Sequence, residues 1–198
     1  MSVPALPSTD LRRRVLDAML RTDFYTFVQA TFPIVSPGAP FAPNWHVEAL
    51  AYALTRVLRG EVRRLIITVP PRSLKSICAS VAFPAFVLGQ DPTCRIICVS
   101  YSEALSRKHA NDGRALMRSG LYRRAFPGTR ISAGKDTELE TMTTARGFRL
   151  ATSVGGTLTG RGGSLLVIDD PLNAFFPCPD QAVRIASCDS HNLAAGDS

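Results

Sequence analysis

Short β-branched apolar runs alternate with helical segments in the middle of the chain, and this alternation restricts the possible folds strongly. The runs Leu65–Val69, Arg95–Val99 and Ser164–Ile168 have the length and composition of buried strands. Helical patterns follow the first two runs, over Ile77–Leu88 and about Ser102–Met117. Because strands joined by helices pair in parallel, the sequence predicts an α/β fold with a mainly parallel sheet.

Two further helices are predicted before the first strand. One covers residues 10 to 30, and its buried stripe is formed by Leu11, Val15, Met19, Phe24, Phe27 and Val28. A loop over Pro33–Pro43 separates it from a second helix, about Trp45–Leu58, which ends near Gly60. These features divide the chain into an N-terminal helical segment and loop (1–44), a partial α/β domain (45–171) and an irregular tail (172–198).

The stretch before the last strand is rich in short elements. Shorter strands are expected at Thr137–Thr143 and Gly147–Ala151, followed by a glycine-rich loop, Gly155–Gly163. The tail from residue 172 shows neither helical nor strand periodicity.

Composition restricts the class of protein. The apolar stretch Ile77–Gly89 is too short to cross a bilayer, and the first twenty residues lack the apolar core of a secretory signal, so a cytoplasmic location is expected. The five cysteines form no CxxC pair and are interpreted mostly as small core residues. The net charge of +7 favours a partner that carries phosphates, although many basic proteins bind no nucleic acid.

The segment after the first strand has the parts of a phosphate-binding loop. Pro70–Leu74 leads into Lys75 and Ser76, at the start of a helix whose N-terminus would face phosphates. A lysine at this position reaches the β- and γ-phosphates, and the hydroxyl binds Mg²⁺. The predicted nucleotide contacts are Pro71, Arg72, Ser73, Leu74, Lys75 and Ser76. Val69 and Leu74 stand where glycines are usual, so an ordinary surface Lys-Ser pair is the alternative.

Two carboxylates end the last apolar run. Asp169 at the strand tip is predicted to hold Mg²⁺ together with Ser76, and Asp170 to polarise the water that attacks the γ-phosphate of ATP. The alternative is a polar strand end that opens a turn at Pro171. The lysine segment and the carboxylates together correspond to the Walker A and Walker B motifs of a P-loop ATPase.

Pro70–Ser76, Gly155–Gly163 and Leu166–Pro171 together resemble the large terminase subunit of tailed bacteriophages, over about residues 45 to 171. The family loop reads Pro-Pro-Arg-x-Gly-Lys-Ser, from which Leu74 departs. The resemblance implies a three-layer P-loop sandwich that uses ATP and Mg²⁺ to drive double-stranded viral DNA into a capsid in the host cytoplasm. It also implies a homo-oligomeric ring, a small terminase subunit and a portal protein as partners, and a C-terminal nuclease for which this chain has no room.

The same resemblance implies roles for four more side chains. Arg72 corresponds to an arginine that senses or stabilises the γ-phosphate, with a phosphate-independent salt bridge as the alternative. Arg161 is either an arginine finger toward a neighbouring subunit or a turn cap. Trp45 and His46 correspond to a segment near the adenine base, and Trp45 is expected to be a core aromatic.

Three functions remain open on the sequence alone. The first is the packaging ATPase, the second an inactive truncated prophage remnant that keeps the motifs, and the third another DNA-dependent P-loop ATPase of helicase type. Basic residues on and after the predicted helix at 102–117 either contact DNA phosphates or form a solvated face: Arg107, Lys108, Arg114, Arg118, Arg123 and Arg124.

Overall fold

The computed structural model describes residues 9–156, 158 and 160–172. Its helices are α1 (Thr9–Thr22), α2 (Phe24–Val35), α3 (Trp45–Leu58), the π-helix η1 (Ile77–Ala82), α4 (Phe83–Gln90), α5 (Glu103–Arg118) and α6 (Gly120–Ala125). Its strands are β1 (Arg95–Ser100), β2 (Ile131–Asp136), β3 (Glu140–Thr143), β4 (Phe148–Ser153) and β5 (Leu165–Asp169). The predicted α/β class is confirmed.

The strands form one mixed sheet of five, in the order β2-β3-β4-β1-β5. The three strands β4, β1 and β5 run parallel, whereas β3 pairs antiparallel with both β2 and β4. In the parallel part, Ser100 at the end of β1 lies opposite Asp169 at the end of β5. The carboxyl ends of these strands therefore meet at one edge, where α/β proteins usually bind ligands.

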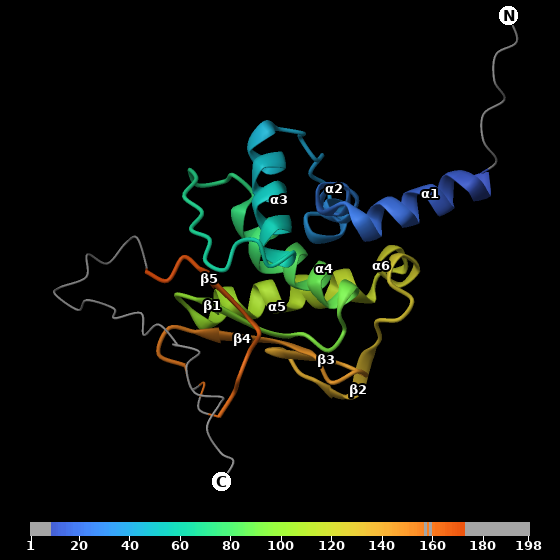
Figure 1. The fold of residues 1–198 in the computed structure, drawn as a ribbon. Coiled ribbons are helices and arrows are strands. Elements are labelled where there is room, and N and C mark those ends of the chain that lie inside the picture. Colours follow the sequence, from blue (N-terminus) through green and yellow to red (C-terminus); the bar gives the residue numbers. More distant parts are fainter. Residues whose placement is uncertain (1–8, 157, 159, 173–198) are drawn as a thin grey trace, which may run out of the picture.

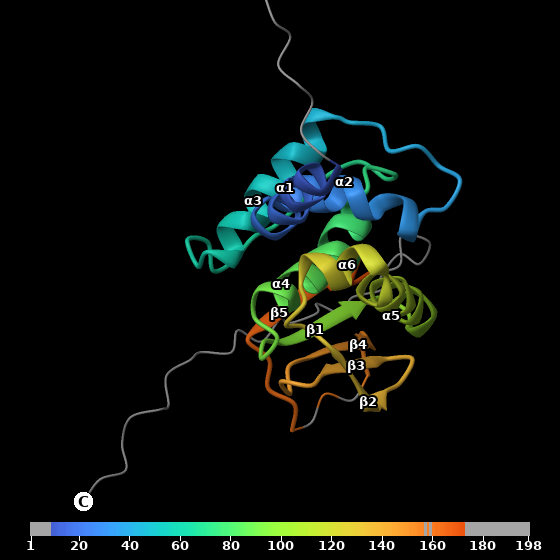
Figure 2. The ribbon, with the colours of Figure 1, turned by 90° about the vertical axis from the view of Figure 1, so that its right-hand side faces the viewer.

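The helices gather on one side of this sheet. Helix α5 packs on β1, β3 and β4, and η1 packs on β5, while α1 to α3 stack beyond them (Figures 1 and 2). The opposite face carries no helix in the part of the chain that the structure describes, and Leu166 and Ile168 of β5 stay exposed on it. In the described residues the helices thus cover one face of the sheet, and the helix layer on the other face that a three-layer sandwich implies is not found among them.

The glycine-rich segment after β4 serves as a crossover. It connects β4 to β5, which lie on either side of β1 in the sheet. A Cβ atom at Gly163 would lie 3.1 Å from the Ile97 side chain and 3.3 Å from the Arg95 carbonyl. A side chain there would therefore be tightly packed against β1, and Ile97 would have to shift by a few tenths of an ångström to admit it.

An aromatic cluster forms the centre of the core. Rings from α2, α4 and the α6 region meet, with Phe86 lying 5.2 Å from both Phe24 and Phe27 between ring centroids. The buried Tyr122 hydroxyl donates a hydrogen bond to the Ala85 carbonyl at 2.8 Å. The N-terminal segment therefore packs into the same core as the α/β segment.

The predicted single helix over residues 10 to 30 is wrong. It divides at Asp23, whose side chain caps α2 by accepting a hydrogen bond from the Thr26 amide at 2.8 Å. The first half of the predicted stripe is exposed, at Leu11, Val15 and Met19, whereas Leu20 is buried instead. The loop predicted at Pro33–Pro43 begins later in the structure than predicted, because α2 continues to Val35.

The predicted strand Leu65–Val69 is also wrong. In the described chain this segment joins no strand ladder, and Ile66 is 91% exposed. It lies across a groove from the free edge of β5. Apolar β-branched composition alone does not make a strand, because a strand also needs a partner.

The helix after the phosphate loop has a distortion that its sequence explains. A proline ring clashes with the carbonyl four residues earlier and offers no N–H to it. Pro84 therefore leaves the Ser80 carbonyl without its helical donor, and the chain passes through the wider η1 turn, in which the Phe83 amide bonds to the Cys78 carbonyl. Pro84 therefore accounts for the π-helix at this point of the chain.

Several predicted elements are confirmed. The helix Trp45–Leu58 has the predicted bounds, and the predicted helix near 102–117 and the strands near 95–99, 137–143, 147–151 and 164–168 match within a few residues.

Cys78 and Cys98 are core residues, and burial raises the pKa of Cys78 to about 12. No helix in the described residues has the length and apolarity to cross a bilayer. The tail beyond residue 172 lies outside the described residues.

Candidate functional site

Residues from the two predicted motifs meet at the carboxyl edge of the parallel strands. The Lys75 ammonium lies 3.0 Å from Asp169 Oδ1 and also pairs with the Asp170 carboxylate. The Ser76 hydroxyl also lies near Asp169 and contributes to lowering the pKa of its carboxyl group. The fold therefore brings together two segments that lie more than ninety residues apart in sequence.

The pairing is reflected in the protonation of both partners. Burial alone would raise the pKa of Asp169, but hydrogen bonds from Ser76, Lys75 and Ser80 outweigh it and hold the pKa below its usual value. Burial alone would lower the pKa of Lys75, yet its bonds to Asp170 and Asp169 raise it. The site thus keeps one ammonium and a buried carboxylate in their charged forms at neutral pH.

The phosphate loop, residues Pro70–Ser76, surrounds a hollow at this edge. Its wall also includes Tyr101, Asp170 and Leu172. The Ser73 hydroxyl closes the loop by donating to the Pro70 carbonyl at 2.5 Å. Arg72 and Leu74 have φ angles of 64° and 59°, in the left-handed region that glycine adopts without strain. Leu74 therefore adopts a glycine-like backbone conformation at the position where the pattern Pro-Pro-Arg-x-Gly-Lys-Ser has glycine.

Replacing Leu74 by glycine is expected to tighten, several-fold, the binding of ATP that the sequence motifs predict. The left-handed backbone costs a residue with a Cβ atom about 1–2 kcal/mol, and the leucine side chain borders a loop that must approach phosphate closely. Fluorescence titration of the parent and Leu74→Gly with a labelled ATP analogue measures the difference.

Leu74→Ala is the matched control, because it shortens the side chain but keeps the Cβ atom and its strain. It is expected to gain less affinity than the glycine variant. Equal or weaker binding by Leu74→Gly than by the parent would show that Leu74 does not obstruct the loop.

Three residues behind Asp169 were not identified from the sequence. Ser80 donates its hydroxyl to Asp169 Oδ2 at 3.0 Å, and His109 Nδ1 lies 3.9 Å from the same oxygen. Arg149 donates to the Ser80 carbonyl at 3.0 Å. All three side chains are buried, and burial lowers the pKa of His109. The one signal in the sequence is Pro84, four residues after Ser80, which frees the carbonyl that Arg149 contacts.

Arg72 lines the hollow with Lys75, whereas Arg161, Trp45 and His46 are not among the residues that line it. Arg161 makes a two-pronged ion pair with Glu140, at 2.8 and 2.9 Å, and covers the Phe148 ring. The expectation that Trp45 is a core aromatic is wrong, since it is 78% exposed at the start of α3, in edge contact with His46. Neither the finger role of Arg161 nor an adenine contact of Trp45 and His46 is tested by these positions.

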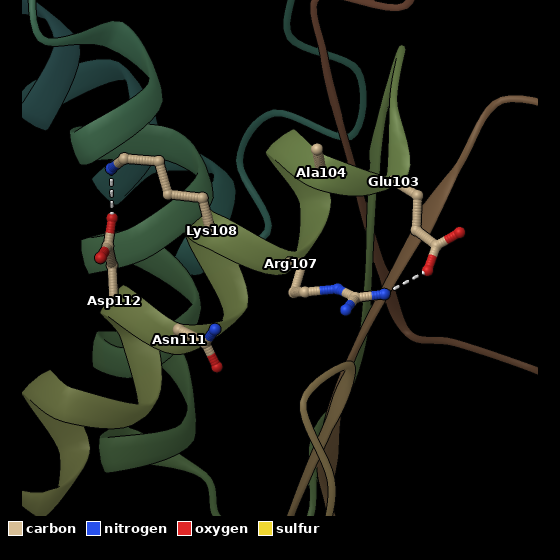
Figure 3. Close-up of a pocket in the computed structure, with 6 residues that line it drawn as sticks. All are labelled: Glu103, Ala104, Arg107, Lys108, Asn111 and Asp112. Carbon is tan, nitrogen blue, oxygen red and sulfur yellow. Dashed lines mark hydrogen bonds and ion pairs between the residues drawn. The ribbon is translucent and has the colours of Figure 1, made fainter.

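The basic face of α5 is largely paired within the chain. Figure 3 shows a surface hollow on this helix, in which Arg107 pairs with Glu103 at 2.6 Å and Lys108 with Asp112 at 2.7 Å. Arg114 and Arg118 pair with Asp136, and Arg124 lies 3.7 Å from Asp17. The Arg107–Glu103 and Lys108–Asp112 pairs lie at the surface and contribute little energy, so this part of the helix matches a solvated face, whereas the Arg114–Asp136 pair is mostly buried.

The donors at the hollow fit a phosphate group with Mg²⁺. Ser76 and Asp169 supply oxygen ligands, and Mg²⁺ commonly takes one or two protein ligands and completes its shell with water and phosphate oxygens. In the described residues no group of three or more His, Cys, Asp or Glu side chains could hold a metal alone. A metal at this site would accordingly need further ligands besides these two side chains.

Comparison with known proteins adds no family name to this geometry. No protein-family model matches the chain, and no curated protein is significantly similar to it.

Proposed function

We propose that this chain is the ATPase part of a viral DNA-packaging motor, a large terminase subunit with a P-loop fold, which hydrolyses ATP to translocate double-stranded DNA. The observation that supports the proposal best is the convergence of Lys75 and Ser76 with Asp169 and Asp170 at the carboxyl edge of the sheet. An ordinary surface Lys-Ser pair would have no reason to meet two carboxylates from a distant strand.

In the proposed reaction, Lys75 exchanges its carboxylate partners for the β- and γ-phosphate oxygens and neutralises part of their charge. Ser76 and Asp169 would hold Mg²⁺, which when bound withdraws charge from the same oxygens. Asp170 orients a water and accepts its proton as the water oxygen bonds to the γ-phosphorus. The bond from this phosphorus to the β,γ-bridging oxygen breaks, and ADP and inorganic phosphate leave.

The proposed DNA partner follows from charge and from the family resemblance. The chain has a net charge of +7, and the exposed arginines of α5 present cations that phosphates can attract. A small terminase subunit, a portal protein and a ring of identical copies are proposed on the resemblance alone.

A second candidate is an inactive remnant of such a subunit. Two observations favour it over a working motor: Leu65–Val69 joins no strand ladder in the described chain, and Leu74 occupies a glycine conformation. Leu65–Val69 lies directly before the phosphate loop and Leu74 lies within it, where small displacements matter most for catalysis.

DNA-stimulated ATP hydrolysis tests the proposal. The purified chain is expected to release phosphate from ATP, and to do so faster with double-stranded DNA. The rate of Lys75→Ala is expected to be lower by at least about a hundredfold. Arg12→Ala, which replaces an exposed cation on α1 away from the hollow, is the matched control. Identical rates in the parent and Lys75→Ala would remove the ATPase assignment, and nucleotide binding without hydrolysis would favour the remnant.

A further inference from the structure

The two carboxylate oxygens of Asp169 contact different partners. Its Oδ1 atom faces Lys75 at 3.0 Å, at the hollow. Its Oδ2 atom accepts the Ser80 hydroxyl at 3.0 Å, away from the hollow, and His109 covers it at 3.9 Å. A carboxylate with a different partner on each oxygen cannot rotate without losing one of them.

Ser80 is itself held in place by the distortion of its helix. Pro84 deprives the Ser80 carbonyl of its usual donor, and the Arg149 guanidinium from β4 donates to it at 3.0 Å. Arg149 is 3% exposed, and its Nε and Nη1 atoms have no hydrogen-bond partner in the described residues. A buried arginine with so few partners is costly, so its one bond to Ser80 calls for an explanation.

We propose that Ser80, anchored by Arg149 through the π-helix, is a positioning residue that orients Asp169 toward the bound nucleotide and its metal. This inference rests on the proposed function. The residue acts through Asp169 and does not touch the nucleotide. Outer residues of this kind commonly change metal affinity about 10- to 100-fold when they are removed.

Nucleotide binding with and without Mg²⁺ is the first test. The dissociation constant of a labelled ATP analogue without Mg²⁺, divided by that with Mg²⁺, reports how much the metal ligands contribute to binding. Ser80→Ala and Ser80→Cys, which remove the hydroxyl or replace it with a weak donor, are expected to lower this ratio about tenfold or more. Their affinity in the absence of metal is expected to stay near that of the parent.

Two controls separate positioning from a general packing effect. Ser80→Thr keeps a hydroxyl and is expected to retain most of the ratio. Ser106→Ala removes another buried serine hydroxyl, which bonds to the Thr152 carbonyl at 2.6 Å, and is expected to leave the ratio unchanged. A parent-like ratio in both Ser80→Ala and Ser80→Cys, or an equal loss in Ser106→Ala, would overturn the proposal.

A structural measurement separates failure of this inference from failure of the proposed function. Crystal structures of the parent and Ser80→Ala without nucleotide are expected to differ in the orientation of the Asp169 carboxylate and in its contact with Lys75. An unchanged carboxylate would overturn the positioning role even if ATP binds. A reoriented carboxylate in a chain that binds no ATP would support the positioning role while removing the function.

Discussion

Asp169→Asn is expected to lower ATP turnover by about 10²–10³ while the fold is retained. Asparagine has the shape of aspartate, and its amide oxygen still accepts the Ser80 hydroxyl. It lacks the charge that pairs with Lys75 at 3.0 Å and that a divalent cation requires. Phosphate release at saturating ATP, combined with thermal melting of both proteins, measures the effect on turnover and on folding separately.

Asp170→Ala is the informative comparison. Asp170 is assigned to the attacking water, so its loss is expected to reduce turnover while affinity for ATP with Mg²⁺ changes only a few-fold. Asp169→Asn is expected to weaken that affinity as well. Turnover by Asp170→Ala equal to that of the parent would remove the proposed base, and parent-like turnover by Asp169→Asn would remove the proposed metal ligand.

Phe27→Ala is expected to reduce the free energy of unfolding by about 3–5 kcal/mol. Phe27 is fully buried, and its ring contacts those of Phe86, Tyr122 and Phe126. Truncation would leave a cavity where α2, α4 and α6 meet. Denaturant unfolding followed by circular dichroism gives the change in free energy directly.

Trp45→Ala is the matched control for this core substitution. Tryptophan is larger than phenylalanine, yet Trp45 is 78% exposed, so its removal is expected to change stability by no more than about 0.5 kcal/mol. A loss of several kcal/mol at Trp45, or a negligible loss at Phe27, would contradict the burial on which both expectations rest.

The sequence predicted those helices and strands that are determined by residues within or next to them. The bounds of α3 follow from an amphipathic stripe after the loop and a glycine near its end, and β1 and β5 follow from short apolar runs. The capping side chain of Asp23 was also present in the sequence, but the helical period on both sides of it favoured one continuous helix. The hydrogen bond from the Thr26 amide to the Asp23 carboxylate is what separates α1 from α2.

Features that depend on distant partners were not predictable in this way. Leu65–Val69 has the composition of a strand, but strand formation requires a neighbour, and no strand described in the structure pairs with it. The motif residues Lys75 and Asp169 were identified because their spacing within each segment is recognisable. Ser80, His109 and Arg149 were missed because they come from η1, α5 and β4 and meet only in the folded chain.

The π-helix also makes the length of one segment more critical than its composition. A π-turn contains more residues than an α-turn, so each side chain in η1 has its position only while the number of residues is kept. Deleting one residue of Ile77–Ala82 would leave Pro84 without the N–H that the carbonyl four residues earlier needs, so no regular α-helix would replace η1, and the η1 side chains would shift relative to α4. Apolar substitutions of similar size within η1 are therefore expected to be tolerated far better than a one-residue deletion, which would misalign the phosphate loop and the core.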